Sequence, residues 1–295
     1  MYVVIGANGY IGSYVIKNIL GQTTDCILAL GRHIDLHYNN ERIQSIRCDI
    51  TKDTDLLLLK EQLDLLKNVK IIYLAAYHHP DDVQKNPKVA WNTNITALAK
   101  ILNMLENIKC LFYVSTEMVY GEGTLEYKFL EKDELNPVNL YGKHKKIAET
   151  LVNGAGFNVI RFPFIIGPSL LPEKKHFYDI IVETLKSGKT IEMFEDAYKT
   201  ALDFDTASNI IVRLVENYQE SIPKILNVSG DDVLSKYEIA CLIAEAQELD
   251  KKLIKPIKMN QNTSIFKENR ANCTLLDNSL LKEVLNLKEV KIKFL

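Results

Sequence analysis

Short apolar runs alternate with amphipathic stretches along the first 165 residues. The apolar runs are continuous, which is typical of strands in a parallel sheet that helices cover on both faces. They predict strands at residues 2–6, 26–30, 43–46, 70–76, 110–115 and 157–162. Between them, apolar positions at helical spacing predict helices at residues 10–20, 53–66, 88–106 and 140–153. Strands and helices that alternate in this way predict an α/β fold with a doubly wound parallel sheet.

The regular alternation of predicted strands and helices ends at about residue 165. A loop rich in proline precedes predicted helices at 175–187, 205–217 and 235–247 and a strand at 224–228, and the last fifty residues look polar and irregular. Thr51 or Asp53 is expected to cap the helix at 53–66. We expect a dinucleotide-binding domain over residues 1–165. Residues 166–295 should mainly form a smaller C-terminal α/β substrate lobe, with residues 200–228 returning to the first domain.

Composition narrows the class of protein. The 295 residues are 47% hydrophobic and 25% charged, with a formal net charge of -2, as in an ordinary globular protein. This balance gives no electrostatic reason to expect nucleic acid or an anionic membrane as a partner. No apolar run approaches the roughly 20 residues that span a bilayer. The early first strand and the five scattered cysteines favour a cytoplasmic protein with buried, reduced thiols.

A glycine-rich turn follows the first predicted strand and opens the first helix. It reads GANGYIG over residues 6–12. Glycines at Gly6, Gly9 and Gly12 permit a tight turn and let backbone N–H groups approach a pyrophosphate, which the helix N-terminus also attracts. The position at the very start of an α/β chain predicts a Rossmann-type dinucleotide site.

Residues at the ends of the next two strands bear on the choice of cofactor. Arg32 stands where a carboxylate would bind the ribose hydroxyls of NAD, and an arginine suits the 2′-phosphate of NADP. Arg32 therefore favours NADP, although Asp35 nearby offers the acidic alternative and NAD stays open. Asp49, followed by Ile50, either reaches the adenine amino group or caps a helix.

Several motifs together resemble the extended short-chain dehydrogenase/reductase superfamily. They are GANGYIG (6–12), CDI (48–50), YLAA (73–76), WNTNITAL (91–98), YVSTEMVYG (113–121), YGKHK (141–145) and RFPFIIGP (161–168). Within it, NPVNLYGKHKKIAE, LNVSGDDVLSKYEIA and RANCTLLDNSLL look most like the dTDP-4-dehydrorhamnose reductase group. These motifs give the predicted cofactor contacts: Gly6, Asn8, Gly9, Tyr10, Ile11, Gly12, Arg32, Asp49, Ile50, Leu74, Ala75, Ala76 and Asn94.

The resemblance also assigns catalytic roles. Tyr141 would exchange the proton of the substrate hydroxyl while the nicotinamide moves a hydride, and Thr116 would hydrogen-bond the reacting oxygen. Free tyrosine has a pKa of about 10, so a cation one helical turn away is expected to stabilise the phenolate. Lys145 would supply that cation and bind the nicotinamide ribose.

The residues after Thr116 bear on the reaction. Sugar-nucleotide dehydratases of this superfamily have an Asp-Glu pair there, and this chain has Glu117 and Met118. A thioether cannot exchange protons, so 4,6-dehydration is disfavoured. The remaining reactions are reduction of a nucleotide-activated 4-keto-6-deoxy sugar by NADPH and epimerisation by an NAD enzyme. Glu117, Met118 and Arg270 are the predicted substrate contacts, although YKTALDF (198–204) departs from the reductase pattern.

A role of another class stays open. Regulatory subunits of methionine adenosyltransferase resemble the same reductase group, which makes an NADP-binding subunit without turnover an alternative. The helices at 88–106 and 140–153 commonly form a dimer interface in the superfamily, so a homodimer is expected. His78 and His79 offer too few ligands for a metal site, and the acidic segment 122–136 is interpreted as a solvated loop that borders the pocket.

Overall fold

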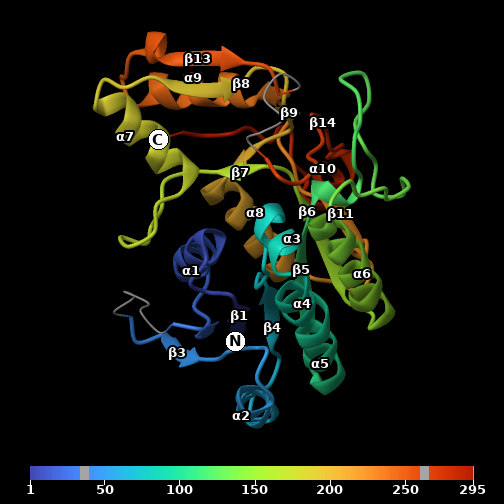
Figure 1. Cartoon of the computed structure of the whole chain (residues 1–295). Coiled ribbons are helices and arrows are strands. Elements are labelled where there is room, and N and C mark those ends of the chain that lie inside the picture. The colour runs from blue at the N-terminus through green and yellow to red at the C-terminus, as the bar shows by residue number, and fades with distance from the viewer. Residues whose placement is uncertain (34–39, 260–265, 295) are drawn as a thin grey trace.

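Seven parallel strands form the centre of the molecule (Figure 1). The structure, a computed structural model, describes residues 1–33, 40–259 and 266–294. The strands lie in the order β11-β6-β5-β4-β1-β2-β3, so the order reverses between β1 and β4. Ligands of such sheets bind at the carboxyl ends of the strands beside this reversal. Their bounds are β1 (Tyr2–Ile5), β2 (Ile27–Gly31), β3 (Ile43–Arg47), β4 (Lys70–Tyr73), β5 (Cys110–Thr116), β6 (Asn158–Phe162) and β11 (Ile225–Asn227).

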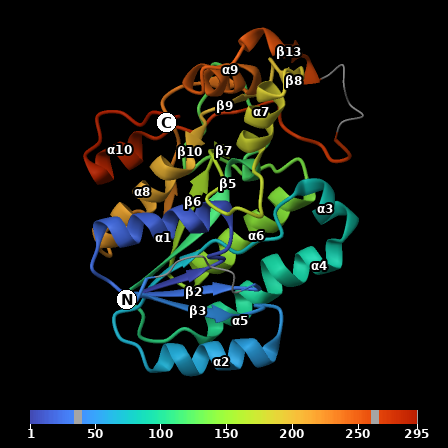
Figure 2. The same cartoon turned by 90° about the vertical axis from the view of Figure 1, so that its left-hand side faces the viewer.

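Helices cover both faces of this sheet (Figure 2). One face packs against α1 (Tyr10–Gln22), α8 (Phe204–Glu216) and α10 (Ser279–Leu285). The other packs against α2 (Asp53–Asp64), α5 (Ala97–Met104) and α6 (Leu140–Gly154). Two separate apolar clusters result, which is why the strands are apolar on both sides.

A smaller lobe with its own apolar core lies at the carboxyl ends of the strands. Its core joins α7 (Phe177–Lys186) and α9 (Lys236–Ala246) to β8 (Ile191–Phe194) and β13 (Ile254–Ile257), which pair in parallel. Two further small sheets pair β10 (Leu202–Asp203) with β7 (Ile165–Ile166), and β9 (Tyr198–Lys199) with β12 (Leu234–Ser235) and β14 (Cys273–Thr274). The shorter helices are α3 (Pro80–Lys85), α4 (Pro87–Trp91), η1 (Asn92–Thr96), η2 (Glu117–Val119) and η3 (Lys251–Leu253).

The predicted fold class, a Rossmann-type doubly wound sheet with a smaller C-terminal α/β lobe, is confirmed. The division of the chain near residue 165 stays a prediction. Strand β11 pairs with β6 in the central sheet, and α8 packs on α1. The chain thus crosses more than once between the sheet and the lobe.

Three local predictions are wrong in whole or in part. Lys52 is the N-cap of α2, and neither Thr51 nor Asp53 caps it, because the Asp49 carboxylate holds the backbone N–H and hydroxyl of Thr51 in a turn. The helix predicted over 88–106 is interrupted by the π-helical turn η1. The last fifty residues are only partly irregular, since they also form η3, β13, β14 and α10, and the two strands pair with strands distant in sequence.

The five cysteines are free thiols, and Cys48, Cys110 and Cys273 are buried as expected. Cys26 is exposed and Cys241 is intermediate, so the expectation of burial fails for these two. Within the described ranges, no helix combines the length and apolar character that crossing a bilayer requires.

A buried ion pair ties helix α6 to the sheet. The Arg161 guanidinium on β6 donates to the Glu149 carboxylate on α6 at 2.6 and 3.1 Å, and both side chains are at most 3% exposed. The Ser115 hydroxyl of β5 donates to the same carboxylate. The remaining guanidinium nitrogen donates to the Tyr120 hydroxyl and to the Glu131 carbonyl. One network therefore fixes α6 against two strands and the loop after β5.

Replacing Glu149 by glutamine leaves the Arg161 charge buried without its counter-ion. We expect Glu149→Gln to lower the free energy of unfolding by about 3–5 kcal/mol, the usual cost of breaking a buried pair. Urea denaturation measures this difference. The control is Glu183→Gln, because Glu183 forms an exposed pair with Lys175 and its loss should cost under about 1 kcal/mol. Equal effects of the two substitutions would contradict the assignment.

Candidate active site

The glycine turn leads from β1 into α1 at the reversal point of the sheet. Gly6 has a φ of +96°, in the region that favours glycine, and its carbonyl accepts the N–H of Gly9 at 3.1 Å. A Cβ at Gly12 would lie 2.5 Å from the Gly6 carbonyl oxygen, and a Cβ at Gly6 would lie 2.7 Å from the Ala75 nitrogen. Gly9 is the N-cap of α1 and has no side chain to occupy the first N–H groups. The turn therefore fits an anionic ligand at a helix N-terminus.

The segment after β4 forms the opposite wall of this crevice. The N–H groups of Leu74 and Ala75 donate to the Ile5 carbonyl, which holds the segment against the glycine turn. The Asn94 side chain accepts from the Tyr77 N–H at 2.8 Å and donates to its carbonyl at 2.9 Å. The π-helical turn η1 presents Asn94 for these bonds. Asn94 thus fixes the backbone next to Ala76, and its amide is committed there.

Three cations gather where β2 and β3 end. A hollow of ≈ 560 Å³ is lined by Arg32, His33, Arg47, Asp49, Lys52 and Asp55. Ile50 does not line this hollow and is buried in the apolar core. The Asn8 amide donates to the His33 carbonyl, and its own oxygen is buried without a hydrogen-bond partner. Of these cations, the sequence analysis identified only Arg32. Arg47 and Lys52 come to the same edge of the sheet through the parallel pairing of β2 with β3. Asp35 lies outside the described residues.

A loop of the lobe closes over the glycine turn. The Lys174 ammonium donates to the Asn8 carbonyl at 2.6 Å, and the Tyr10 hydroxyl donates to the Lys175 carbonyl at 2.8 Å. Within the described residues, no carboxylate forms an ion pair with Lys174. Lys174 belongs to no recognisable motif, so its position at the glycine turn could not be predicted from the sequence.

Tyr141 and Lys145 lie one turn apart at the start of α6. Asn139 caps this helix through the Gly142 N–H, at 2.9 Å, and a Cβ at Gly142 would lie 2.5 Å from the Met118 carbonyl. The helix consequently packs closely on the segment after β5. Tyr141 is 8% exposed and Lys145 is 2% exposed.

The hydrogen bonds of Lys145 go to strand β5. Its ammonium donates to the Tyr113 hydroxyl at 2.9 Å and to the Val114 carbonyl at 2.7 Å, and it lies 5.9 Å from the centre of the Tyr141 ring. Burial lowers the pKa of Lys145 to about 7. Burial, followed by the charge of Glu117, raises the pKa of Tyr141 above its usual value. Without a cofactor, then, Tyr141 is a protonated phenol.

The strand that ends in Thr116 leads directly into the predicted substrate contacts. The Thr116 hydroxyl donates to the Glu117 carboxylate at 3.1 Å and accepts the Met118 N–H at 3.3 Å. Glu117 is 3% exposed, and burial raises the pKa of its carboxyl group. Helix α6 contacts η2, so Tyr141 and Thr116 belong to the same part of the crevice.

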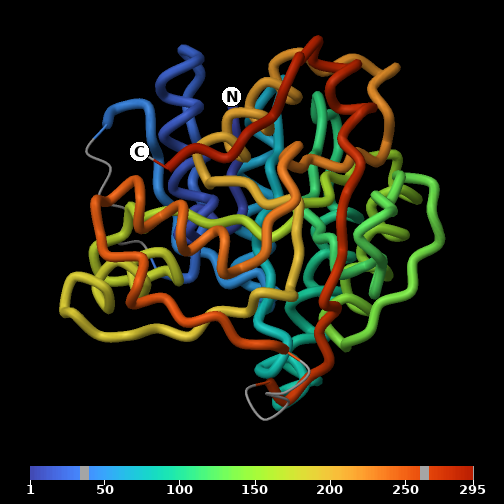
Figure 3. Tube along the Cα trace, turned by 90° about the horizontal axis from the view of Figure 1, so that it is seen from above, coloured from blue at the N-terminus to red at the C-terminus, as the bar shows by residue number. Residues whose placement is uncertain are grey.

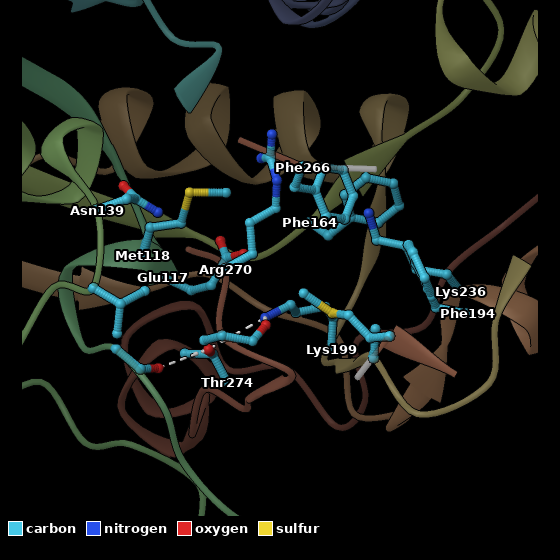
Figure 4. Close-up of a pocket in the computed structure, with 15 residues that line it drawn as sticks. Glu117, Met118, Asn139, Phe164, Phe194, Lys199, Lys236, Phe266, Arg270 and Thr274 are labelled. Atoms are coloured by element: carbon cyan, nitrogen blue, oxygen red, sulfur yellow. Dashed lines mark hydrogen bonds between the residues drawn. The ribbon is translucent and has the colours of Figure 1, made fainter. Parts of the chain in front are cut away.

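A pocket of ≈ 70 Å³ opens beside Glu117 and Met118 (Figure 4). Arg270 lines it, and its guanidinium donates to Asp81 of α3 at 2.9 Å and lies over the Phe266 ring. Figure 3 shows the red C-terminal segment reaching α3 across the molecule. The sequence analysis did not identify Asp81, the partner of Arg270, or the two lysines that line the pocket, Lys199 and Lys236. The volume is small compared with the roughly 300–1,000 Å³ of small-molecule sites, so a sugar nucleotide requires this pocket to widen.

The remaining candidates have structural contacts. The segment 122–136 is not simply a solvated loop, because Glu122 accepts the N–H groups of Asn272 and Cys273, and Glu131 accepts that of Asn227. Among the described residues, no group of three or more His, Cys, Asp or Glu side chains is placed to hold a metal ion.

The fold is a Rossmann-type α/β fold, and a glycine turn stands where the order of its strands reverses. The family described as RmlD substrate binding domain matches residues 1–292, and the chain belongs to this family. The predicted enzyme class, an NAD(P)-dependent oxidoreductase, is in keeping with this family.

Two kinds of curated relatives are similar in sequence. Methionine adenosyltransferase 2 subunit beta from Danio rerio is 28% identical over 254 residues, which cover 83% of this chain and 73% of the relative. The match to the Bos taurus subunit spans only 57% of that protein. The probable low-salt glycan biosynthesis reductase Agl14 from Haloferax volcanii is 25% identical over 85% of this chain and 81% of the relative.

Solved structures share the fold. UDP-glucuronic acid 4-epimerase from Bacillus cereus, in complex with UDP-glucuronic acid and NAD, superposes with a TM-score of 0.81 at 19% identity, over 98% of this chain and 94% of that one. A dTDP-4-dehydrorhamnose reductase from Bacillus anthracis in complex with NADP gives a TM-score of 0.77 at 18% identity, over 99% and 94%. Both kinds of cofactor thus occur on this fold.

Gly12 tests the close packing of the turn. We expect Gly12→Ala to weaken NADPH binding at least about tenfold and to cost about 1–3 kcal/mol of stability, because its Cβ meets backbone atoms. Fluorescence titration and urea denaturation measure the two effects. Gly21→Ala is the matched control in the same helix, with open space around its Cβ, and should add about 0.5–1 kcal/mol. Unchanged NADPH affinity in Gly12→Ala would contradict the placement of the cofactor.

Proposed function

We propose that the protein reduces the keto group of a nucleotide-activated sugar with NADPH. The nicotinamide supplies a hydride when it is bound, and Tyr141 donates the proton. The observation that carries this proposal is the burial of Tyr141 and Lys145 on one turn of α6, beside the strand that ends in Thr116. The resemblance in sequence implies a 4-keto-6-deoxy sugar. This chain departs from the reductase group at Met118 and in residues 198–204, and these positions lie in or beside the pocket.

The residues of the crevice divide the binding of the cofactor among them. The first N–H groups of α1 and the Lys174 ammonium suit the pyrophosphate, since both are positive and adjoin the glycine turn. The backbone of Leu74 to Ala76 would line the path to the nicotinamide. Lys145, already bonded to β5, would donate a further hydrogen bond to a ribose hydroxyl.

The protonated state of Tyr141 without a cofactor is compatible with reduction, and an oxidised nicotinamide would supply the positive charge that an epimerase needs. A reductase needs a protonated phenol at the start of its reaction, and burial together with the Glu117 carboxylate raises the pKa of Tyr141. An epimerase begins by oxidising its substrate and needs the phenolate first. An NAD-dependent epimerase is the alternative, and it would retain its cofactor on dilution where a reductase exchanges it.

Arg32, Arg47 and Lys52 support NADP as the cofactor. Three cations at the ends of β2 and β3 suit a 2′-phosphate, which carries charge that NAD lacks. NAD stays the alternative.

A regulatory subunit without turnover is the second candidate. The similarity to methionine adenosyltransferase 2 subunit beta favours it. Recovery of a stoichiometric partner enzyme, with no NADPH oxidation on any keto-sugar nucleotide, would establish this role in place of the reductase.

A homodimer and a cytoplasmic location complete the proposal. Apolar side chains on the helices predicted for the interface are exposed, among them Val89, Trp91 and Ile147. Their exposure supports a dimer through α4, α5 and α6.

Removal of the Tyr141 hydroxyl tests the proton transfer. We expect Tyr141→Phe to reduce kcat by about 10²–10⁴-fold, the usual contribution of a positioned acid. NADPH affinity should stay within about twofold, because the ring and its packing are kept. A screen of NADPH oxidation against nucleotide-linked keto-sugars supplies the substrate. Full turnover in this variant would exclude Tyr141 as the proton donor.

Arg32 tests the choice of cofactor. We expect Arg32→Ser to weaken NADPH binding about 10–100-fold, as for a lost hydrogen bond to a charged group. NADH binding by the same variant is the internal control and should change by less than about threefold, since NADH has no 2′-phosphate. Equal losses of affinity for NADPH and NADH would show that Arg32 does not contact the 2′-phosphate.

A further inference from the structure

Two lysines line the pocket beside Glu117, of which Lys199 is buried and Lys236 is partly exposed. Lys199 is the last residue of β9 and is 7% exposed, and Lys236 is the first residue of α9. Figure 4 shows both side chains reaching into the pocket from the C-terminal lobe. They come from segments 37 residues apart in the sequence, so the fold alone brings their ammonium groups to one cavity.

Neither lysine has a carboxylate at ion-pair distance among the described residues. The Lys199 ammonium donates to the Ala271 carbonyl at 3.3 Å and to the Thr274 hydroxyl at 3.2 Å, and both of these are uncharged acceptors. The Lys236 ammonium lies 4.6 Å from the centre of the Phe164 ring and 6.0 Å from that of Phe177. Aromatic faces attract a cation but do not neutralise it.

The charges of the pocket leave an excess of cations. Arg270 is paired with Asp81 at 2.9 Å, which accounts for one positive and one negative charge. Glu117 is the carboxylate that lines the pocket with Lys199 and Lys236, and its bonded partner is the Thr116 hydroxyl. The Glu122 carboxylate, which does not line the pocket, also acts on Lys199. Burial raises the pKa of Glu117, lowers the pKa of Lys199 and lowers the pKa of Lys236 to about 8.

An unpaired buried cation is costly unless something supplies the opposite charge. The two lysines are separate from the cations at the dinucleotide site, which are Arg32, Arg47, Lys52 and Lys174. They line the same pocket as Arg270, whose guanidinium is already paired with the Asp81 carboxylate. The pocket adjoins Glu117 and Met118, which directly follow Thr116. It therefore lies on the side of the sugar that undergoes reaction.

We propose that the sugar unit of the substrate carries a carboxylate, which binds between Lys199 and Lys236. The inference rests on the proposed function and narrows its substrate to an acidic sugar nucleotide, in place of a 6-deoxy sugar with an uncharged methyl group. Lys199 belongs to the segment YKTALDF, where the sequence departs from the reductase group. A change of substrate charge gives that departure a physical reason.

The test compares ligands that differ in one charge. Calorimetric titration of the NADP-loaded protein would use UDP-glucuronic acid, UDP-glucose and UDP as probes, with dTDP as a check on the base. We expect wild type to bind UDP-glucuronic acid at least about tenfold more tightly than UDP-glucose, as for an added charged hydrogen bond. In Lys236→Met and in Lys199→Met this ratio should fall to about one, with UDP affinity within about twofold of wild type.

The control variant is Lys251→Met in the same lobe. Lys251 forms an exposed pair with Glu245, away from the pocket, and this variant should keep the wild-type ratio. Lys236→Met should fold at least as stably as wild type, because it removes a partly buried charge that forms no ion pair with any described residue. Thermal unfolding without ligand provides this separate readout.

Two results would overturn the inference and leave the proposed function standing. One is equal affinity of wild type for the acidic and the neutral sugar nucleotide. The other is a loss of UDP affinity in Lys236→Met as large as the loss for UDP-glucuronic acid, which would place the diphosphate between the lysines. If wild type bound none of the four probes, the inference and the proposed function would both fail.

Discussion

Helix α6 is held on strand β5 by polar groups buried in their interface, and the proposed chemistry depends on this contact. Lys145 bonds the Tyr113 hydroxyl and the Val114 carbonyl, and one turn later Glu149 joins Ser115 and Arg161. Each bond joins one particular residue of the helix to one particular residue of a strand. Because buried polar groups tolerate little displacement, they fix where Tyr141 stands relative to the end of β5.

The same burial sets the electrostatics. A phenol packed against apolar side chains, with the Glu117 carboxylate nearby, resists ionisation. The expectation that Lys145 makes Tyr141 acidic is not met without a cofactor, because the ammonium is committed to β5 and is itself easily deprotonated in that site. Ionisation of Tyr141 then requires a further positive charge, such as the one an oxidised nicotinamide brings. A proton donor before hydride transfer and a stabilised phenolate after it are compatible in one site.

Motifs with local geometry could be predicted from the sequence. The strands, the glycine turn and the Tyr141–Lys145 spacing follow from patterns within a few residues. Contacts between distant segments could not be predicted in this way. Arg47 lies near Arg32 only because of the register in which β3 pairs with β2. Lys174 bonds to Asn8, which is 166 positions away in the sequence. Lys199 and Lys236 face one cavity only because β9 and α9 belong to the same lobe. The acidic segment 122–136 is only in part a solvated loop, because Glu122 and Glu131 accept backbone N–H groups far along the chain.

A crystal structure of the protein with NADPH tests the central claim most directly. We expect the pyrophosphate to lie on the first turn of α1 and the nicotinamide ribose to be hydrogen-bonded to Lys145. The Tyr141 hydroxyl should face the reactive face of the nicotinamide. A dinucleotide bound elsewhere, or a Tyr141 hydroxyl turned away from the nicotinamide, would contradict it.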